Sequence, residues 1–277
     1  MIKYEQIVRE IKEAIKESQT TLPDWVISKL EDIKENETKK AKEQIETILE
    51  NIRIAKEEKK PICQDTGVPI FYVKHGTQLS LDFSLSKALK EVTQKATQEI
   101  PLRPSIVSPW ERKNTGDNTG DKIPIINYEP VEGSKLEIIV FPKGAGSENM
   151  SKQKMFNPGQ KGEVIEWIID SVQEAGPKPC PPIFLGIGIG GTFDYSTQLS
   201  KEALIELPQQ SQGKIRELER EILEKVNSLE IGPMGLGGKT TALDVKIKTA
   251  HCHTASLPVA INIQCWANRK AKRVFEE

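Results

Sequence analysis

The chain has 277 residues, of which 37% are hydrophobic and 29% charged, and its 39 Lys and Arg balance 40 Asp and Glu. A net charge of −1 gives no field that would attract nucleic acid or an anionic membrane surface. The N-terminus is charged from its third residue, and no apolar run approaches the length of a membrane span. We therefore expect a cytoplasmic protein that binds neither nucleic acid nor membrane.

The first 60 residues predict helix almost throughout. Asp24 follows a proline, which is typical of a helix start, and apolar residues recur at helical spacing as far as residue 57. The clearest repeat is the four-residue spacing of Ile7, Ile11 and Ile15. Pro61 ends this region, and residues 68–76 have the character of a strand.

Beyond this strand, helical and strand-like segments alternate. A helix over 80–100, capped by Ser80 or Ser84, leads into a long connection over 101–130 that is rich in Pro, Asn, Gly and Asp. We then expect a strand over 135–146, a helix over 159–175, a buried strand over 181–191, a helix over 200–229, and strands around 242–250 and 258–266. The segments lack a regular βαβ rhythm, so the sequence predicts an α+β fold in which a helical segment, residues 1–60, packs on a mixed or antiparallel sheet within a single large domain over residues 1–277.

Two glycine-rich stretches look like nucleotide-binding loops but lack the required context. Residues 186–191 satisfy G-x-G-x-x-G, yet no helix is predicted from the last glycine and no acidic residue ends a second strand about 20 positions on. Residues 232–241 fail the P-loop spacing, because Pro233 stands where the first glycine belongs. We expect no dinucleotide or nucleoside triphosphate site, although backbone N–H groups of the second loop could still bind a carboxylate or phosphate.

The repeat NTGDNTGD over 114–121 has the residue types of a calcium loop. It lacks the twelve-residue ligand order and the terminal Glu of an EF-hand. We interpret it as turn chemistry, in which the Asn, Thr and Asp side chains satisfy the backbone locally or line a polar cleft.

The four cysteines, at positions 63, 180, 252 and 265, are widely spaced, and we do not expect a disulfide framework in a cytosolic chain. For any single cysteine, the simplest explanation is a buried free thiol that packs as a small apolar side chain. Structural zinc usually takes ligands from short C-x₂₋₄-C pairs, which this sequence lacks. An iron-sulfur cluster bound by three cysteines is the sharper hypothesis for Cys63, Cys180 and Cys265. A zinc-stabilised scaffold that uses Cys180, Cys252, His253 and Cys265 is the alternative.

Seven motifs together resemble the class I, iron-sulfur-dependent fumarate hydratases and their relatives, the L-tartrate dehydratases. The resemblance runs from about residue 2 to residue 272 and matches the N-terminal region of the single-chain enzymes or the α subunit of the two-subunit ones. The motifs are CQDTG at 63–67, NTGDN at 114–118, FPKGAGSEN at 141–149, KPCPP at 178–182, GIGIGG at 186–191, GPMGLGGKTTALDVKI at 232–247 and HCHTASLPVAINIQCWANR at 251–269.

The resemblance implies a 4Fe-4S cluster held by Cys63, Cys180 and Cys265. Three thiolate ligands leave one iron open, and this iron would act as a Lewis acid on the substrate hydroxyl. Cys252 then has no assigned role. Because it lies between two histidines, it remains the alternative to Cys265 as the third cluster ligand.

The resemblance also implies roles for five further residues. Asp65 would act in proton transfer, with His253 as its partner. Gln64 and Arg103 would bind substrate carboxylates, the latter through its planar fork, and Gly146 would offer its backbone N–H.

In the family, a second domain or a separate β subunit completes the active site. The resemblance therefore implies that this chain is the α subunit of a hydro-lyase, with a β subunit as partner in an α2β2 heterotetramer. The expected reaction is the reversible hydration of fumarate, a small dicarboxylate, to L-malate. L-tartrate dehydration is the alternative within the same chemistry.

Overall fold

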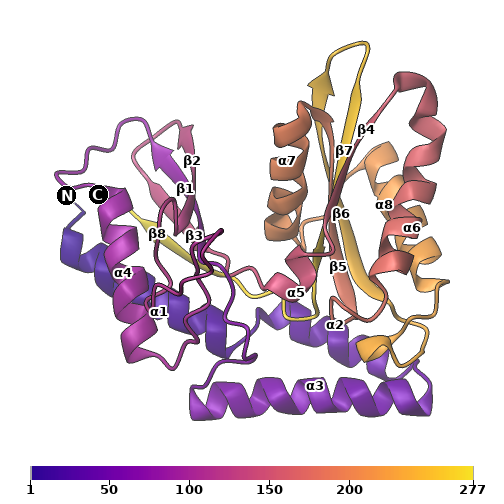
Figure 1. Ribbon diagram of the computed structural model, residues 1–277, viewed down its shortest axis with the longest axis horizontal. Coiled ribbons are helices and arrows are strands. Elements are labelled where there is room, and N and C mark those ends of the chain that lie inside the picture. The colour runs from indigo at the N-terminus through magenta and orange to yellow at the C-terminus, as the bar shows by residue number, and fades with distance from the viewer. Residues whose placement is uncertain (1, 277) are drawn as a thin grey trace. The chain divides into compact units, whose positions relative to one another are not determined.

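The structure is a computed structural model that describes residues 2–276 (Figure 1). The chain forms two compact units. Unit 1 contains the residues up to Pro23, Glu50–Ala145 and the residues from Arg269, and unit 2 contains Asp24–Leu49 and Gly146–Asn268. Each unit has its own four-stranded mixed sheet, so the predicted α+β class is confirmed. That residues 1–277 form one large domain stays a prediction.

Unit 1 is built around a sheet with the strand order β2-β1-β3-β8. The strands are β1 (Ile70–Gly76), β2 (Ile125–Val131), β3 (Leu136–Val140) and β8 (Ala271–Phe275). The β1–β2 pair is parallel, and the β1–β3 and β3–β8 pairs are antiparallel. The helices α1 (Tyr4–Thr20) and α4 (Leu85–Glu99) pack against this sheet.

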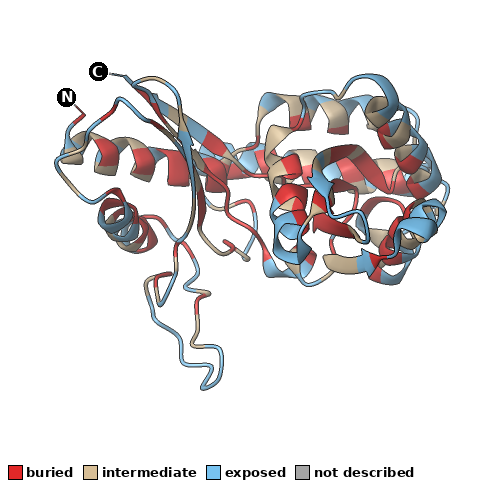
Figure 2. Cartoon of the chain, turned by 90° about the horizontal axis from the view of Figure 1, so that it is seen from above, coloured by how far each residue is buried: buried red, intermediate tan, exposed pale blue. Residues whose placement is uncertain are grey.

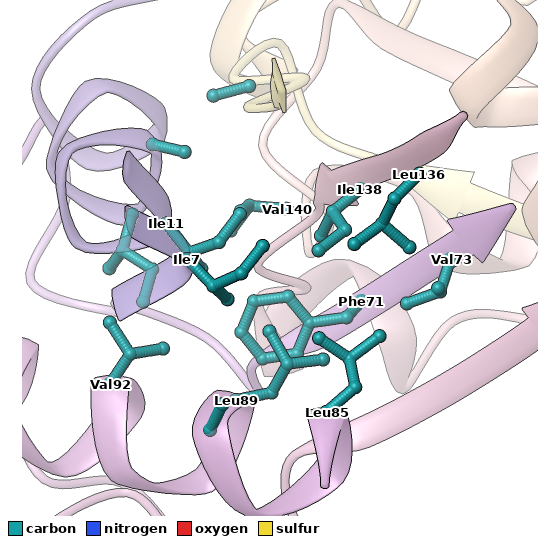
Figure 3. Close-up of a cluster of buried hydrophobic side chains, with 14 of the residues drawn as sticks. Ile7, Ile11, Phe71, Val73, Leu85, Leu89, Val92, Leu136, Ile138 and Val140 are labelled. Carbon is teal, nitrogen blue, oxygen red and sulfur yellow. The ribbon is translucent and has the colours of Figure 1, made fainter. Parts of the chain in front are cut away.

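The core of unit 1 follows from the helical spacing of its apolar residues. Ile7 and Ile11 on α1 and Leu89 on α4 point toward Phe71 and Ile138 of the sheet (Figure 3). All five side chains are buried. The predicted isoleucine repeat therefore forms the buried face of α1, and burial of each such side chain contributes about 1.5–3 kcal/mol.

Unit 2 contains a sheet with the strand order β4-β7-β5-β6. Its strands are β4 (Lys152–Phe156), β5 (Ile183–Gly191), β6 (Ala242–Cys252) and β7 (Leu257–Gln264), and only the β5–β6 pair is parallel. The helix α7 (Phe193–Glu206) covers one face, and α6 (Val164–Ala175) and α8 (Gly213–Asn227) cover the other (Figure 1). Buried residues lie between helices and sheet, with exposed residues on the outer faces (Figure 2).

The remaining elements are α2 (Asp24–Lys34) in unit 2, α3 (Lys39–Glu58), which contributes residues to both units, α5 (Ala145–Glu148) and the 3₁₀ turns η1 (Pro158–Glu163) and η2 (Pro233–Gly235). Within the described residues, no helix has the length and apolar character needed to cross a membrane. The predicted helix start at Asp24 is confirmed, and Ser84, rather than Ser80, caps α4 by accepting a hydrogen bond from the backbone N–H of Lys87 at 3.4 Å.

Several boundaries differ from the sequence-based expectation. The connection over 101–130 contains most of β2, and β4, β8 and α5 were not predicted. The helix expected over 200–229 is two helices, because Pro208 has no backbone N–H to continue the helix that ends at Glu206. The first of these, α7, begins at Phe193, directly after the glycine motif, where no helix was expected.

The glycines of residues 186–191 allow a helix to lie directly on a strand. A Cβ on Gly186 would stand 2.0 Å from the backbone oxygen of Ser200, and a Cβ on Gly188 would stand 2.0 Å from that of Ser196. Both glycines lie within β5 rather than in a loop beyond it. The motif therefore serves α7–β5 packing, and this packing role, rather than the absence of a helix, argues against a dinucleotide site.

The second glycine-rich loop binds a carboxylate of its own chain. The side chain of Glu37 accepts hydrogen bonds from the backbone N–H groups of Lys239 at 2.9 Å and Thr240 at 2.6 Å. A Cβ on Gly238 would stand 2.9 Å from Glu37 Oε2. The anion-binding capacity expected of this loop is thus used within unit 2.

Gly188→Ala is expected to lower the free energy of unfolding by about 3 kcal/mol, because the added methyl group would force α7 away from β5. Chemical denaturation measures this change. The matched control is Gly159→Ala, where a Cβ meets no atom within 4 Å and where we expect a change within about 0.5 kcal/mol. Equal losses in the two variants would contradict the packing role.

Candidate functional site

The turn over residues 63–67 presents three of the predicted site residues in unit 1. Cys63 and Gln64 are exposed and Asp65 is half-buried. Asp65 Oδ1 accepts a hydrogen bond from the backbone N–H of Gly67 at 2.9 Å, and Oδ2 accepts one from Ala145 at 2.7 Å. The carboxylate is therefore held in one orientation while the thiol and amide before it remain open to a ligand.

The inner side of this turn is anchored on α1. Gln19 Nε2 donates to the backbone oxygen of Thr66 at 2.7 Å, and the Gln19 backbone oxygen accepts from Ile62 at 2.8 Å. Gln19 Oε1 in turn accepts from Arg269 Nη1 at 2.8 Å. Since Gln19, Thr66 and Arg269 are buried, these bonds are shielded from competing water.

Arg103 is fixed beside the same turn through its backbone. Its carbonyl oxygen accepts from Thr66 Oγ1 at 2.9 Å and from Asn118 Nδ2 at 3.2 Å. Asn118 is buried and also accepts a hydrogen bond from the Ser105 backbone N–H at 2.7 Å. The side chain of Arg103 itself is exposed. The structure thus brings the segments that carry Gln64, Asp65 and Arg103 together.

The NTGD repeat forms a structured turn, as predicted. Burial opposes the charge of Asp117, but hydrogen bonds from the backbone N–H and hydroxyl of Thr119 and from the amide of Gln94 outweigh it and lower the pKa of this carboxyl below its ordinary value. Asp117 precedes Asn118, so this turn supports the residue that anchors Arg103.

Two of the predicted cluster ligands lie on neighbouring turns of unit 2. Trp266, which follows Cys265, donates its backbone N–H to the carbonyl oxygen of Cys180 at 3.4 Å. The buried amide of Gln264 donates to Cys265 Sγ at 3.3 Å and so orients that turn. Cys180 is exposed, Cys265 is half-buried, and both are present as thiols. The predicted Gly146 belongs to the same region, because a Cβ there would stand 3.7 Å from the backbone oxygen of Lys178.

His253 and Cys252 lie at the other end of the same sheet. On β5, Phe184 is paired with Gln264, whereas Gly191 is paired with Cys252. These pairs are seven residues apart, which corresponds to about 23 Å along a strand. One chain therefore does not bring Cys252 or His253 to Cys265.

This separation corrects the alternative metal set. The zinc site considered from the sequence, with Cys180, Cys252, His253 and Cys265, is divided between the two ends of one sheet. Over residues 2–276, the structure shows no group of three or more His, Cys, Asp or Glu arranged to hold a metal ion.

Sequence reasoning missed the residues that hold the site in place. These are Gln19, Thr66, Asn118, Ala145 and Arg269. Four of them stand inside quoted motifs, at 63–67, 114–118, 141–149 and 251–269, so proximity to a candidate residue was an available signal. Gln19 had a weaker signal, because it is a polar residue in a buried stretch of an amphipathic helix.

Comparisons with known proteins agree with the motifs. The model of the family described as fumarate hydratase (fumerase) matches residues 8–274. A putative L(+)-tartrate dehydratase subunit alpha from Methanocaldococcus jannaschii is 47% identical over 273 residues, which cover 95% of this chain and 96% of that protein. The L(+)-tartrate dehydratase subunit alpha of Escherichia coli (strain K12) is 32% identical over 256 residues, which cover 91% of this chain and 84% of that protein.

Asp117→Asn is expected to destabilise the protein by about 1 kcal/mol at pH 6, because it replaces a charge-assisted acceptor. The lowered pKa means that the contribution of Asp117 is present above the unfolded value of about 3.9 and is lost as the pH falls through the folded value. The difference between wild type and variant should therefore shrink in urea denaturation series from pH 6 to pH 3. Asp121→Asn, at the exposed equivalent position of the repeat, is the control, and a difference that stays constant with pH for Asp117→Asn would contradict the expectation.

Proposed function

The chain belongs to the fumarate hydratase family, and on this premise we propose that it is the α subunit of a heteromeric hydro-lyase that adds water to, and removes it from, a small dicarboxylate. The observation that carries the proposal is the turn over 63–67. It presents an exposed thiol and amide before a carboxylate held by two backbone N–H groups, with Arg103 anchored beside it. This set suits the binding of carboxylates and the transfer of a proton.

We propose that Cys63, Cys180 and Cys265 hold a 4Fe-4S cluster. The donor set fits such a group, because iron-sulfur clusters take thiolate ligands and all three residues are thiols. Two of them stand on neighbouring turns of unit 2, and the third is exposed on unit 1. When bound through three thiolates, the cluster would supply an open iron as a Lewis acid toward the substrate hydroxyl.

The chain's own residues would bind the substrate and move a proton. The guanidinium of Arg103 and the amide of Gln64 would hold substrate carboxylates, and Gly146 would donate its backbone N–H. Asp65 would take up and return a proton at a carboxylate oxygen. Each of its two oxygens accepts one backbone hydrogen bond and keeps a second lone pair for that purpose.

His253 remains the proposed partner of Asp65, but its position requires a second copy of the chain. It stands at the opposite end of the unit 2 sheet from Cys265, so it would reach a site that contains this ligand from another α subunit. The α2β2 assembly that we propose contains two such subunits. The His253 Nδ1 accepts the backbone N–H of Ala255 at 3.1 Å, which leaves Nε2 to donate to a carboxylate.

We propose fumarate and L-malate as the substrate pair, with L-tartrate as the second candidate. The family description supports fumarate. The relative that is 47% identical is described as a tartrate dehydratase subunit, and this likeness specifically favours the second candidate. L-malate and L-tartrate are both dicarboxylates with a hydroxyl group next to a carboxylate, and fumarate is the dicarboxylate that dehydration of L-malate yields, so the arginine and amide described above suit either candidate.

The chain purified without oxygen is expected to be brown and to contain iron and sulfide, because the three thiols would bind a cluster. Cys63→Ser, Cys180→Ser and Cys265→Ser should each lose most of the visible absorbance and iron. Cys252→Ser is the matched control and should retain both. A colourless protein that contains zinc, or equal losses for Cys252→Ser and Cys265→Ser, would contradict the proposed ligand set.

The isolated chain is expected to show little or no turnover, and anaerobic mixing with its β subunit should restore it. Activity of the pair is measured with L-malate, fumarate and both tartrate isomers, which also decides between the two candidate substrates. In the assembled enzyme, Asp65→Asn should lower kcat about 100-fold or more, because it removes the group that transfers the proton. Full activity of the chain alone would overturn the proposed need for a β subunit.

A further inference from the structure

Arg269 is a buried cation that the proposed chemistry leaves without a role. It stands at the end of the last motif, two residues before the start of β8, and is 2% exposed. An arginine side chain stays protonated in proteins, so unit 1 holds a full positive charge in its interior. Its Nη1 donates to the neutral amide oxygen of Gln19, and its Nε is buried without a hydrogen-bond partner.

A buried charge is costly unless an opposite charge lies close by. The carboxylate of Asp65 lies near the guanidinium. Asp65 Oδ2 and Arg269 Nη2 lie 3.1 Å and 3.7 Å from one and the same point, which is where a Cβ on Gly144 would stand. Both groups thus lie on the side of Gly144 from which a side chain would project, and the next residue, Ala145, donates its N–H to Asp65.

The guanidinium also supports the turn that carries Asp65. Through Gln19 it is connected to the backbone oxygen of Thr66, the residue after Asp65. Arg269 therefore acts on Asp65 in two ways: its charge lies beside the carboxylate, and its hydrogen bond to Gln19 fixes the backbone behind it.

We propose that Arg269 is the positioning residue of Asp65. The buried guanidinium, with Gln19 as intermediary, holds the carboxylate in the orientation in which it accepts from Gly67 and Ala145. The catalytic part of this inference rests on the proposed function of Asp65, whereas the structural part does not. It is also consistent with glycine at residue 144, because a Cβ there would stand 3.1 Å from Asp65 Oδ2 and crowd the carboxylate.

The first test uses hydrogen exchange of the Gly67 and Ala145 amides, which donate to Asp65, in the full chain without a cluster. We expect Arg269→Gln and Gln19→Leu to raise the exchange rates of both amides about tenfold, because the carboxylate loses its fixed orientation. The matched control is Arg273→Gln on β8, because Arg273 forms an ion pair with Glu17 at 2.8 Å and, among the residues that the structure describes, has no hydrogen bond to Gln19 or Asp65. The control should leave both rates unchanged.

The second test uses the assembled enzyme. Arg269→Gln is expected to lower kcat about tenfold while KM stays within about twofold, because Arg103 keeps the hydrogen bonds from Thr66 and Asn118 that anchor it, and the proton-transferring group is the one misplaced. Arg269→Lys, which keeps the positive charge, should recover part of the loss, and Arg273→Gln should match wild type.

Unchanged exchange at Gly67 and Ala145 in both Arg269→Gln and Gln19→Leu would overturn the inference, as would a fall in kcat that Arg273→Gln reproduces. Should Arg269→Gln fail to fold, Gln19→Leu and Gly144→Ala decide the same question. Gln19→Leu removes the hydrogen bond between Gln19 and Arg269, and Gly144→Ala crowds the Asp65 carboxylate, while both variants keep the buried charge. If the wild-type pair shows no hydro-lyase activity, the proposed function fails, yet the exchange measurements still decide whether Arg269 positions Asp65.

Discussion

The pair of hydrogen bonds accepted by the Asp65 carboxylate is the constraint on which the candidate site depends. One bond closes the local turn at Gly67, and the other joins it to Ala145, 80 residues further along the chain. The two residues before Asp65, Cys63 and Gln64, are exposed. Asp65 is therefore both the residue that stabilises the turn and the candidate for proton transfer. In the proposed arrangement, the buried guanidinium of Arg269 supports its carboxylate electrostatically.

Unit 2 contributes its candidate residues through the rigidity of a single sheet. The glycines of β5 let α7 lie on the strand at backbone distance, which leaves no room for the sheet to shift beneath it. At one end of that sheet the turns of Cys180 and Cys265 meet, and at the other end the β6–β7 turn exposes His253. The same sheet therefore keeps Cys180 and Cys265 close together and keeps His253 far from both. This is the physical basis for proposing that the site is shared between copies of the chain.

The parts of the fold that could be predicted are those with a local cause. The spacing of Ile7, Ile11 and Ile15 is a property of one helix, and the apolar run of β5 marks a buried strand by itself. By contrast, β4 and β8 are five-residue strands with charged residues, and they form because partners distant in sequence pair with them. In the same way, Cys63, Gln64 and Asp65 were found because they are adjacent in one motif. Gln19 was missed because its partner, Arg269, is 250 residues away.

The sequence by itself determined the chemical inventory of this protein: the α+β class, the order of most elements, the membership of a hydro-lyase family and the residue types available for carboxylate binding and cluster ligation. The tertiary structure alone decided which of these residues meet. In the folded chain, the glycines of 186–191 allow α7 to pack on β5, and the Glu37 carboxylate accepts the backbone N–H groups of the loop at 238–240. Cys252 and Cys265 lie at opposite ends of one sheet, and Arg269 lies near Asp65. The reason is that residue type and periodicity are local properties, whereas hydrogen bonds, burial and charge compensation depend on distances between segments that the chain brings together only on folding.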